Sequence, residues 1–249
     1  MTTKGRSKSP ASSIPGSIGF GELLPARFRK RENRFVVQVK FQHEVHPAHL
    51  ANPGRLEELL LPGQKLWIHP VQNPNRKTQF DVVLVELEDT LVSVNSQLPN
   101  LIIGQALADG ALSGFRERQR VRREVKRGHS RIDFVVEEAG NSRWLEIKSV
   151  TLVVNGTARF PDAPTLRGTR HLRELQEIVQ NGGLATVIFV IQREDAQAFA
   201  PNDEMDPAFG TALRSAADAG VEIRAIRCTV TQQAITLNGA VPVCPCQVK

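Results

Sequence analysis

The residues best placed to do chemistry lie between Ser130 and Val150. Two short runs of aliphatic, β-branched and aromatic residues, 132–136 and 144–148, are separated by residues 137–142, whose composition is typical of a turn. This pattern predicts a β-hairpin with Asp133 on its first strand and Glu146 and Lys148 on its second. Because side chains alternate along a strand, Glu146 and Lys148 should share one face.

Carboxylates on neighbouring strands, followed by a lysine, are suited to hold a hard divalent cation such as Mg²⁺ or Mn²⁺. We therefore predict that Asp133 and Glu146 bind the metal and that Lys148 holds or activates a water beside it. A second acid-x-Lys tripeptide begins at Glu124, so the tripeptide alone carries little weight and the strand context decides. An exposed hairpin with an ordinary ion pair is the alternative.

The arrangement of Asp133, Glu146 and Lys148 resembles the core motif of the PD-(D/E)xK nuclease superfamily. The resemblance implies that these three side chains form a catalytic site, with Glu124 on the preceding strand as a further acidic metal ligand. An ion pair between Glu124 and the neighbouring Arg122 or Lys126 would explain Glu124 equally well.

The positive charge of the chain is concentrated just before and into this hairpin. Residues 115–131 contain eight Lys/Arg and two Glu, a net charge of +6 that equals the net charge of the whole chain. Such a concentration indicates a polyanionic partner such as nucleic acid, although a solvated charged face is the alternative. The arginines that we predict to contact its phosphates are Arg116, Arg118, Arg120, Arg122, Arg123 and Arg131 in or beside this segment, and Arg34, Arg55, Arg167 and Arg170 elsewhere.

Residues 16–98 have the pattern of a small β-rich domain. Strands are expected over residues 21–28, 34–41, 66–68, 80–87 and 91–94, with one short helix, Arg55–Leu61, between prolines and glycines. In the second strand, Phe35, Val37, Val39 and Phe41 should point inward. Five strands with one interposed helix predict an OB-like β-barrel.

Residues 99–243 should form an α/β domain that contains the hairpin. Helices are expected over 100–110, 166–180 and 207–219, and strands over 120–127, 184–191 and 221–227. The alternation of strands and helices after the hairpin predicts parallel crossovers. In the helix Leu166–Gln180, the side chains of Arg167, Arg170, His171 and Arg173 should be exposed.

The remaining segments are short. Residues 1–15 are predicted to be a disordered basic tail and residues 244–249 a C-terminal tail. No apolar run approaches the ~18 residues of a membrane span, and no signal-peptide core is present. The three cysteines lack zinc-site spacing, so we expect a cytoplasmic protein with reduced thiols. The oligomeric state stays open.

Several longer runs resemble the sugar fermentation stimulation protein (SfsA) family. They are RENRFVVQV, AHLANPGRLEELLLPG, SRIDF, WLEIKSVTLV, IFVIQREDAQAFAPNDEMDPAFGTAL and the idiosyncratic FPDAPTLRGTRHLRELQEI. The resemblance implies an OB-like N-terminal domain joined to a PD-(D/E)xK nuclease-like α/β domain. It also implies DNA binding without strong sequence preference and a proposed regulatory role in sugar (maltose) metabolism. Because no residue of the core motif is replaced, a Mg²⁺-dependent nuclease is the alternative function.

Overall fold

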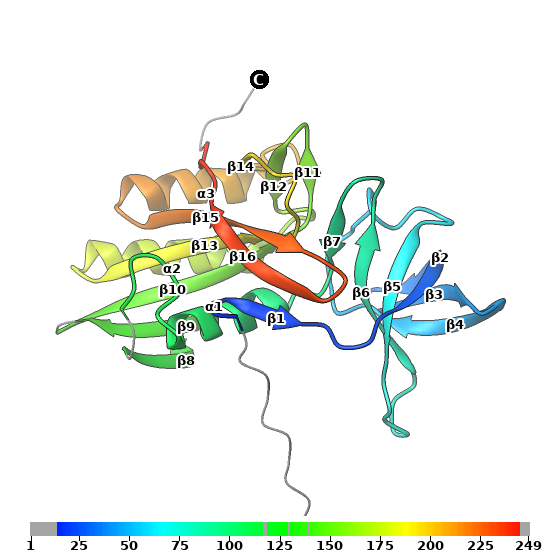
Figure 1. Cartoon of the computed structure of the whole chain (residues 1–249). Coiled ribbons are helices and arrows are strands. Elements are labelled where there is room, and N and C mark those ends of the chain that lie inside the picture. The colour runs from blue at the N-terminus through cyan, green and yellow to red at the C-terminus, as the bar shows by residue number, and fades with distance from the viewer. Residues whose placement is uncertain (1–13, 117–118, 129, 139, 245–249) are drawn as a thin grey trace, which may run out of the picture.

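The computed structural model describes residues 14–116, 119–128, 130–138 and 140–244. A β-barrel and a larger α/β domain lie side by side (Figure 1). The predicted tails, residues 1–15 and 244–249, fall almost entirely outside the described residues, and so does Arg118. No helix among the described residues is both long and apolar enough to span a membrane.

The barrel closes because the first strand in the sheet order also pairs with a strand near the other end of that order. The strand order is β4-β3-β2-β5-β6-β7, and β4 also pairs with β6. Strands β2 to β6 therefore form a closed ring, and β7 adds to its side. The alternating strand pattern buries Val37, Val39, Leu66 and Ile68 inside, which confirms the OB-like fold. The strand bounds are β2 Leu24–Asn33, β3 Val36–Phe41, β4 Glu44–His49, β5 Lys65–Pro70, β6 Phe80–Glu86 and β7 Leu91–Ser93.

Three local predictions for the barrel are wrong. Residues 55–61 form turns rather than a helix, because Leu56 has a left-handed φ of 53° that interrupts helical geometry. Phe35 points outward and is 45% exposed, since it lies in the turn between β2 and β3, where the Asn33 side chain accepts its backbone N–H. The first barrel strand also starts at Leu24 rather than at residue 21.

The α/β domain is built on a seven-stranded sheet of order β1-β16-β15-β13-β10-β9-β8. Strand β13 pairs in parallel with β10 and β15, as the βαβ pattern predicts, while β8, β9 and β10 are antiparallel. The strand bounds are β1 Ser17–Gly19, β8 Arg120–Arg127, β9 Ser130–Glu138, β10 Asn141–Val150, β13 Leu184–Ile191, β15 Glu222–Val230 and β16 Ala234–Ala240.

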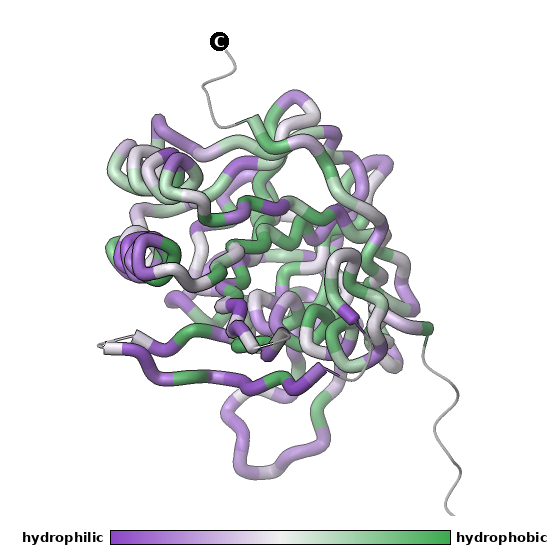
Figure 2. Tube along the Cα trace, turned by 90° about the vertical axis from the view of Figure 1, so that its left-hand side faces the viewer, coloured by the Kyte–Doolittle hydropathy of each residue, from purple (hydrophilic) through white to green (hydrophobic). Residues whose placement is uncertain are grey.

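Helices cover both faces of this sheet. One cluster of buried residues joins α2 Leu166–Gln180 and α3 Pro207–Asp218 to the sheet, and a second joins α1 Leu98–Ala108 to the opposite face. Hydrophobic residues accordingly concentrate on the central strands (Figure 2). A small additional sheet contains β11 Val153–Val154, β12 Thr157–Phe160 and β14 Ala198–Pro201.

Strand β1 precedes the barrel strands in the sequence but belongs to the sheet of the α/β domain. Residues 17–19 pair antiparallel with residues 234–236 at the end of the chain. The segment 16–98, expected to form one domain, therefore contributes its first three-residue strand to the other domain. Local sequence pattern gives no signal for this pairing, because the partner strand lies more than two hundred residues away.

Candidate active site

The predicted hairpin places Asp133 beside the strand that carries Glu146. Strands β9 and β10 pair up to Leu145 and Phe134, and Asp133 is the next residue on β9. Its Oδ2 accepts the backbone N–H of Ile147 at 2.7 Å, and its Oδ1 accepts from the Asn100 side chain on α1 at 2.7 Å. The carboxylate is therefore buried, at 9% exposed, and held from two elements.

Glu146 is more deeply buried and is held on one oxygen only. Its Oε1 accepts from Lys148 Nζ at 2.5 Å and also contacts Nδ1 of His171. Its Oε2 is buried and has no hydrogen-bond partner among the described residues. A buried carboxylate oxygen that lacks a donor is costly unless something else binds it. The free oxygen could therefore accept a further donor or a cation.

The surroundings shift the pKa values of the two carboxyl groups in opposite directions. Burial, followed by the neighbouring Glu146 charge, raises the pKa of Asp133 to about 6. Burial alone would also raise the pKa of Glu146, but Lys148 and His171 outweigh it and lower that pKa. Two carboxylates whose pKa values are pushed apart are common at functional sites, although structural ion-pair networks do the same.

His171 is a site residue that the sequence prediction missed. The prediction places its side chain on the exposed face of the helix, whereas it is 1% exposed and contacts Glu146. The signal is present in the helical spacing: Gly168, His171, Leu172 and Leu175 fall on one face, and all four are buried. His171 is therefore a positioning residue for the Glu146 carboxylate.

Glu124 lies on β8 across from Asp133, between the register pairs Arg123–Phe134 and Val125–Ile132. Its side chain is exposed and its backbone has a left-handed φ of 52°. Within the described ranges, no group of three or more His, Cys, Asp or Glu side chains is arranged to hold one ion. The third metal ligand predicted at Glu124 is not part of the constellation, which consists of Asp133, Glu146, Lys148 and His171.

The predicted DNA-contacting arginines fall into three groups. Near the site, Arg170 donates to Ser130 Oγ at 3.1 Å, Arg167 donates to His171 at 3.4 Å, and Arg131 lies close to Asp133 in sequence. Along β8, Arg120 and Arg122 share Glu137, while Arg123 stacks over Phe134 and donates to the Asn100 carbonyl. Three others are exposed in loops and turns, namely Arg34, Arg55 and Arg116.

Together, the closed barrel and the mixed sheet covered by helices define a two-domain protein that joins an OB domain to an α/β domain with a buried acid pair. Two family models match the chain: the SfsA N-terminal OB domain over residues 30–94 and the sugar fermentation stimulation protein RE domain over residues 97–234. The chain belongs to the sugar fermentation stimulation protein family.

Relatives match over nearly the whole chain. A sugar fermentation stimulation protein homolog of Desulforamulus reducens is 43% identical over 94% of this chain and 96% of that protein. A homolog from Chloroflexus aurantiacus is 46% identical over 92% and 88%, respectively. The structure of Pyrococcus furiosus SfsA in complex with Ca²⁺ superposes with a TM-score of 0.84 at 28% identity, covering 91% of this chain and 97% of that one.

Proposed function

We propose that this protein binds DNA without strong sequence specificity through the basic surface around the acid pair. The observation that carries the proposal is the set of exposed cations on β9 and α2 without acidic partners. Arg131, Arg167 and Arg170 are exposed, and none of them forms an ion pair with an acidic side chain that the structure describes. Arginines without acidic partners are suited to phosphate oxygens, which carry no sequence information.

The family relationship supports a physiological context for the proposal. Relatives carry the name sugar fermentation stimulation protein homolog, and we include a regulatory role in sugar (maltose) metabolism in the proposed function. A cytoplasmic location is part of the same proposal, because Cys228 and Cys244 are free thiols and thiols stay reduced in that compartment.

The salt dependence of DNA affinity tests the binding proposal. The logarithm of the association constant should fall linearly with the logarithm of salt concentration, with a slope of about 0.9 per phosphate bound on duplex DNA. Replacing Arg131, Arg167 and Arg170 with Ala should reduce the slope by about 0.9 for each phosphate that the protein no longer neutralises. Removing Arg120 and Arg122 should matter less, because Glu137 already neutralises part of their charge.

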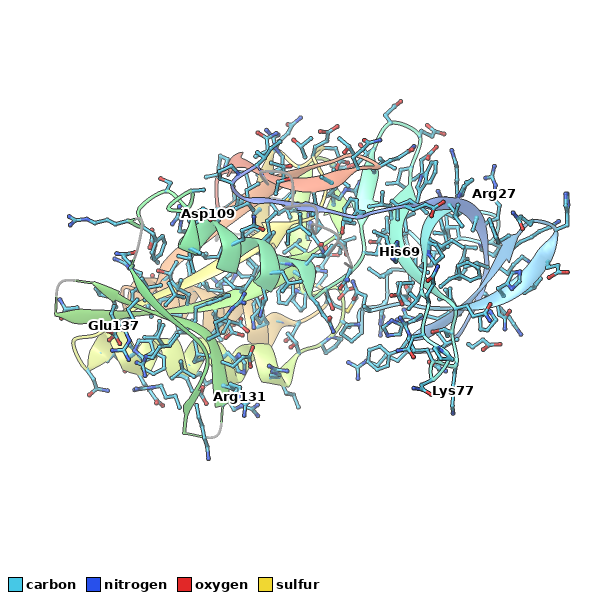
Figure 3. The ribbon with its side chains drawn as sticks, turned by 60° about the horizontal axis from the view of Figure 1, so that its bottom comes forward. Arg27, His69, Lys77, Asp109, Arg131 and Glu137 are labelled. Carbon is cyan, nitrogen blue, oxygen red and sulfur yellow. The ribbon has the colours of Figure 1, made fainter. Side chains whose placement is uncertain are left out.

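Lys77→Ala is the matched control for this experiment. Lys77 is exposed on the barrel, and Arg131 lies on the other domain (Figure 3). The control should leave the slope unchanged, and all variants should affect unrelated DNA sequences equally. A slope that the triple variant does not alter, or a weakening confined to one DNA sequence, would remove the basis of the proposal.

Metal-dependent DNA cleavage is the second candidate function, and the orphaned Oε2 of Glu146 favours it. Mg²⁺ is commonly bound by one or two carboxylates, with waters and substrate phosphates as its other ligands, so Asp133 and Glu146 fit such an ion. The Ca²⁺ bound by the Pyrococcus furiosus relative supports the same assignment.

The chain's own residues would divide the work at such a site. A bound Mg²⁺ or Mn²⁺ would supply Lewis-acid stabilisation of the phosphate and lower the pKa of water. Lys148 holds Glu146 at 2.5 Å and would orient the attacking water. His171 fixes Glu146 from the side of α2. Arg131, Arg167 and Arg170 would hold the negatively charged strand.

Substitutions of Glu146 and Lys148 test metal binding and cleavage separately. Mn²⁺ should raise the melting temperature of the wild-type protein by mass action, and Glu146→Gln should abolish this rise. Lys148→Ala should keep the rise yet lower any cleavage rate at least about 100-fold. Glu86→Gln, which neutralises a glutamate of the barrel, is the control for both measurements. A melting temperature that millimolar Mn²⁺ does not move, with no cleavage, would leave only the binding function.

A further inference from the structure

A cavity between the two domains begins at Lys148. It has a volume of about 230 Å³ and is lined by the end of β10, by residues 159–165 and by the barrel loop 52–54, with Arg34 beside them. Because Lys148 also bonds Glu146, the cavity and the acid pair share one wall. Pockets for drug-sized ligands are roughly 300–1,000 Å³, so this cavity suits a group no larger than about one nucleotide.

The cavity is lined by two arginines, and one of them has a buried donor atom without an acceptor among the described residues. Arg159 lines it, and the Nε of Arg159 is buried without a hydrogen-bond partner among the described residues. Arg34 lines it as well and makes no ion pair with any described carboxylate. Hydroxyl groups of Ser96, Ser149 and Thr165 complete the polar lining. A buried donor nitrogen without an acceptor indicates a site for an anion, and arginine matches phosphate geometry.

Asp162 also lines the cavity and joins the two domains. It lies against Gly54, and the backbone amides of Leu56 and Arg55 point to its carboxylate, with the Arg31 charge nearby. Burial is the largest influence on Asp162 and raises its pKa. The hydrogen bonds of Asp162 therefore go to the barrel loop and serve the contact between the domains.

Hydrogen bonds fix the walls of the cavity. Arg31 donates to the carbonyls of Asn52, Gly54 and Arg55 at 2.7–3.0 Å, which fixes the barrel loop. The opposite wall is fixed by Asp206, which accepts the Thr165 N–H at 2.8 Å. Asp162 lies against Gly54 of the barrel loop, and the cavity has room for about one nucleotide, so it suits the end of a strand better than its middle.

We propose that the cavity binds the terminal phosphate and nucleotide of a DNA strand, with Arg159 and Arg34 holding the phosphate and Lys148 facing the acid pair. The proposal rests on the proposed DNA binding and adds a preference for strand ends. A 5′-phosphate and a 3′-phosphate share this chemistry, and the experiment distinguishes them.

Circular and linear DNA separate this proposal from general DNA binding. In EDTA, affinities are measured by fluorescence anisotropy for a circular single strand and for linear strands of the same length and sequence. The linear strands carry a 5′-phosphate, a 3′-phosphate or neither. One phosphorylated linear strand should bind about tenfold more tightly than the circle. Arg159→Gln should remove this advantage and leave binding of the circle unchanged, and Lys77→Gln should change neither.

Direct titration with deoxynucleoside monophosphates provides a measurement that needs no variant. The monophosphate should bind the wild-type protein and compete with the linear strand but not with the circle. Equal affinity for circle and linear strands, together with no monophosphate binding, would overturn the strand-end proposal while the DNA-binding function stands. Failure of the circle to bind would instead refute the DNA-binding function, and the monophosphate titration would still decide whether the cavity takes a nucleotide.

Discussion

Asp133 and Glu146 are similar side chains on adjacent strands, yet their surroundings push their pKa values in opposite directions. The difference arises from what each carboxylate touches. Glu146 has two cationic or donor side chains on one oxygen, whereas Asp133 has neutral amide donors and a negative neighbour. Asp133 is therefore the group whose ionisation is sensitive to pH near neutrality in the metal-free protein.

The raised pKa of Asp133 predicts how stability depends on pH. A carboxyl group whose pKa is about 6 in the folded protein, against 3.8 for an ordinary aspartate, stabilises the fold when protonated. Its contribution is present below pH 3.8 and is lost as the pH rises through about 6. The change amounts to at most about 3 kcal/mol.

Urea unfolding in EDTA at a series of pH values measures this contribution as a difference between two proteins. The stability of Asp133→Asn relative to wild type should increase between about pH 4 and pH 7 and then level off. Affinity for Mn²⁺ should rise over the same interval, because protons and the ion compete for the carboxylate. Parallel stability curves for the two proteins would show that Asp133 titrates normally.

At the scale of helices and strands, the sequence predicts those elements whose signals are local. Helix α2 has the expected bounds, because Thr165 caps it by accepting the Gly168 N–H at 3.0 Å and glycines follow it. Strand β13 is recognisable as a continuous apolar run, typical of a strand covered on both faces. The β9–β10 hairpin brings Asp133 beside Glu146 by local folding alone.

Other elements depend on distant partners and could not be predicted. Strand β4 contains Pro47 and little alternation, and it forms because it completes the ring between β3 and β6. Strands β11, β12 and β14 have two to four residues each and carry no periodic signal. Within the candidate site, Asn100 and His171 come from helices outside the hairpin, so the motif alone could not reveal them. The catalytic role of the motif stays a prediction.

At the scale of the whole molecule, Gly54 permits a close approach between the barrel and the α/β domain. A Cβ at this position would overlap Oδ2 of Asp162, so the carboxylate would have to move. Gly54→Ala should therefore loosen the contact between the domains and destabilise the protein by about 1–3 kcal/mol.

Urea unfolding of Gly54→Ala and Gly19→Ala checks this expectation. Gly19 is a suitable control because an added Cβ would meet Gln233 at an ordinary 3.7 Å. Limited proteolysis of the barrel loop should also be faster in Gly54→Ala alone. Identical unfolding midpoints for both variants would mean that Asp162 can shift without cost.

The pairing of β1 with β16 has a consequence for the order of synthesis. Ser17 bonds Thr236 across a sequence separation of 219 residues, so residues 17–19 leave the ribosome long before their partner strand exists. The barrel, whose strands are all made early, can form first, while β1 must wait and dock last. Until it does, the backbone of β16 presents an open sheet edge to other nascent chains. A fusion partner or deletion that prevents this docking should therefore lower the yield of monodisperse protein.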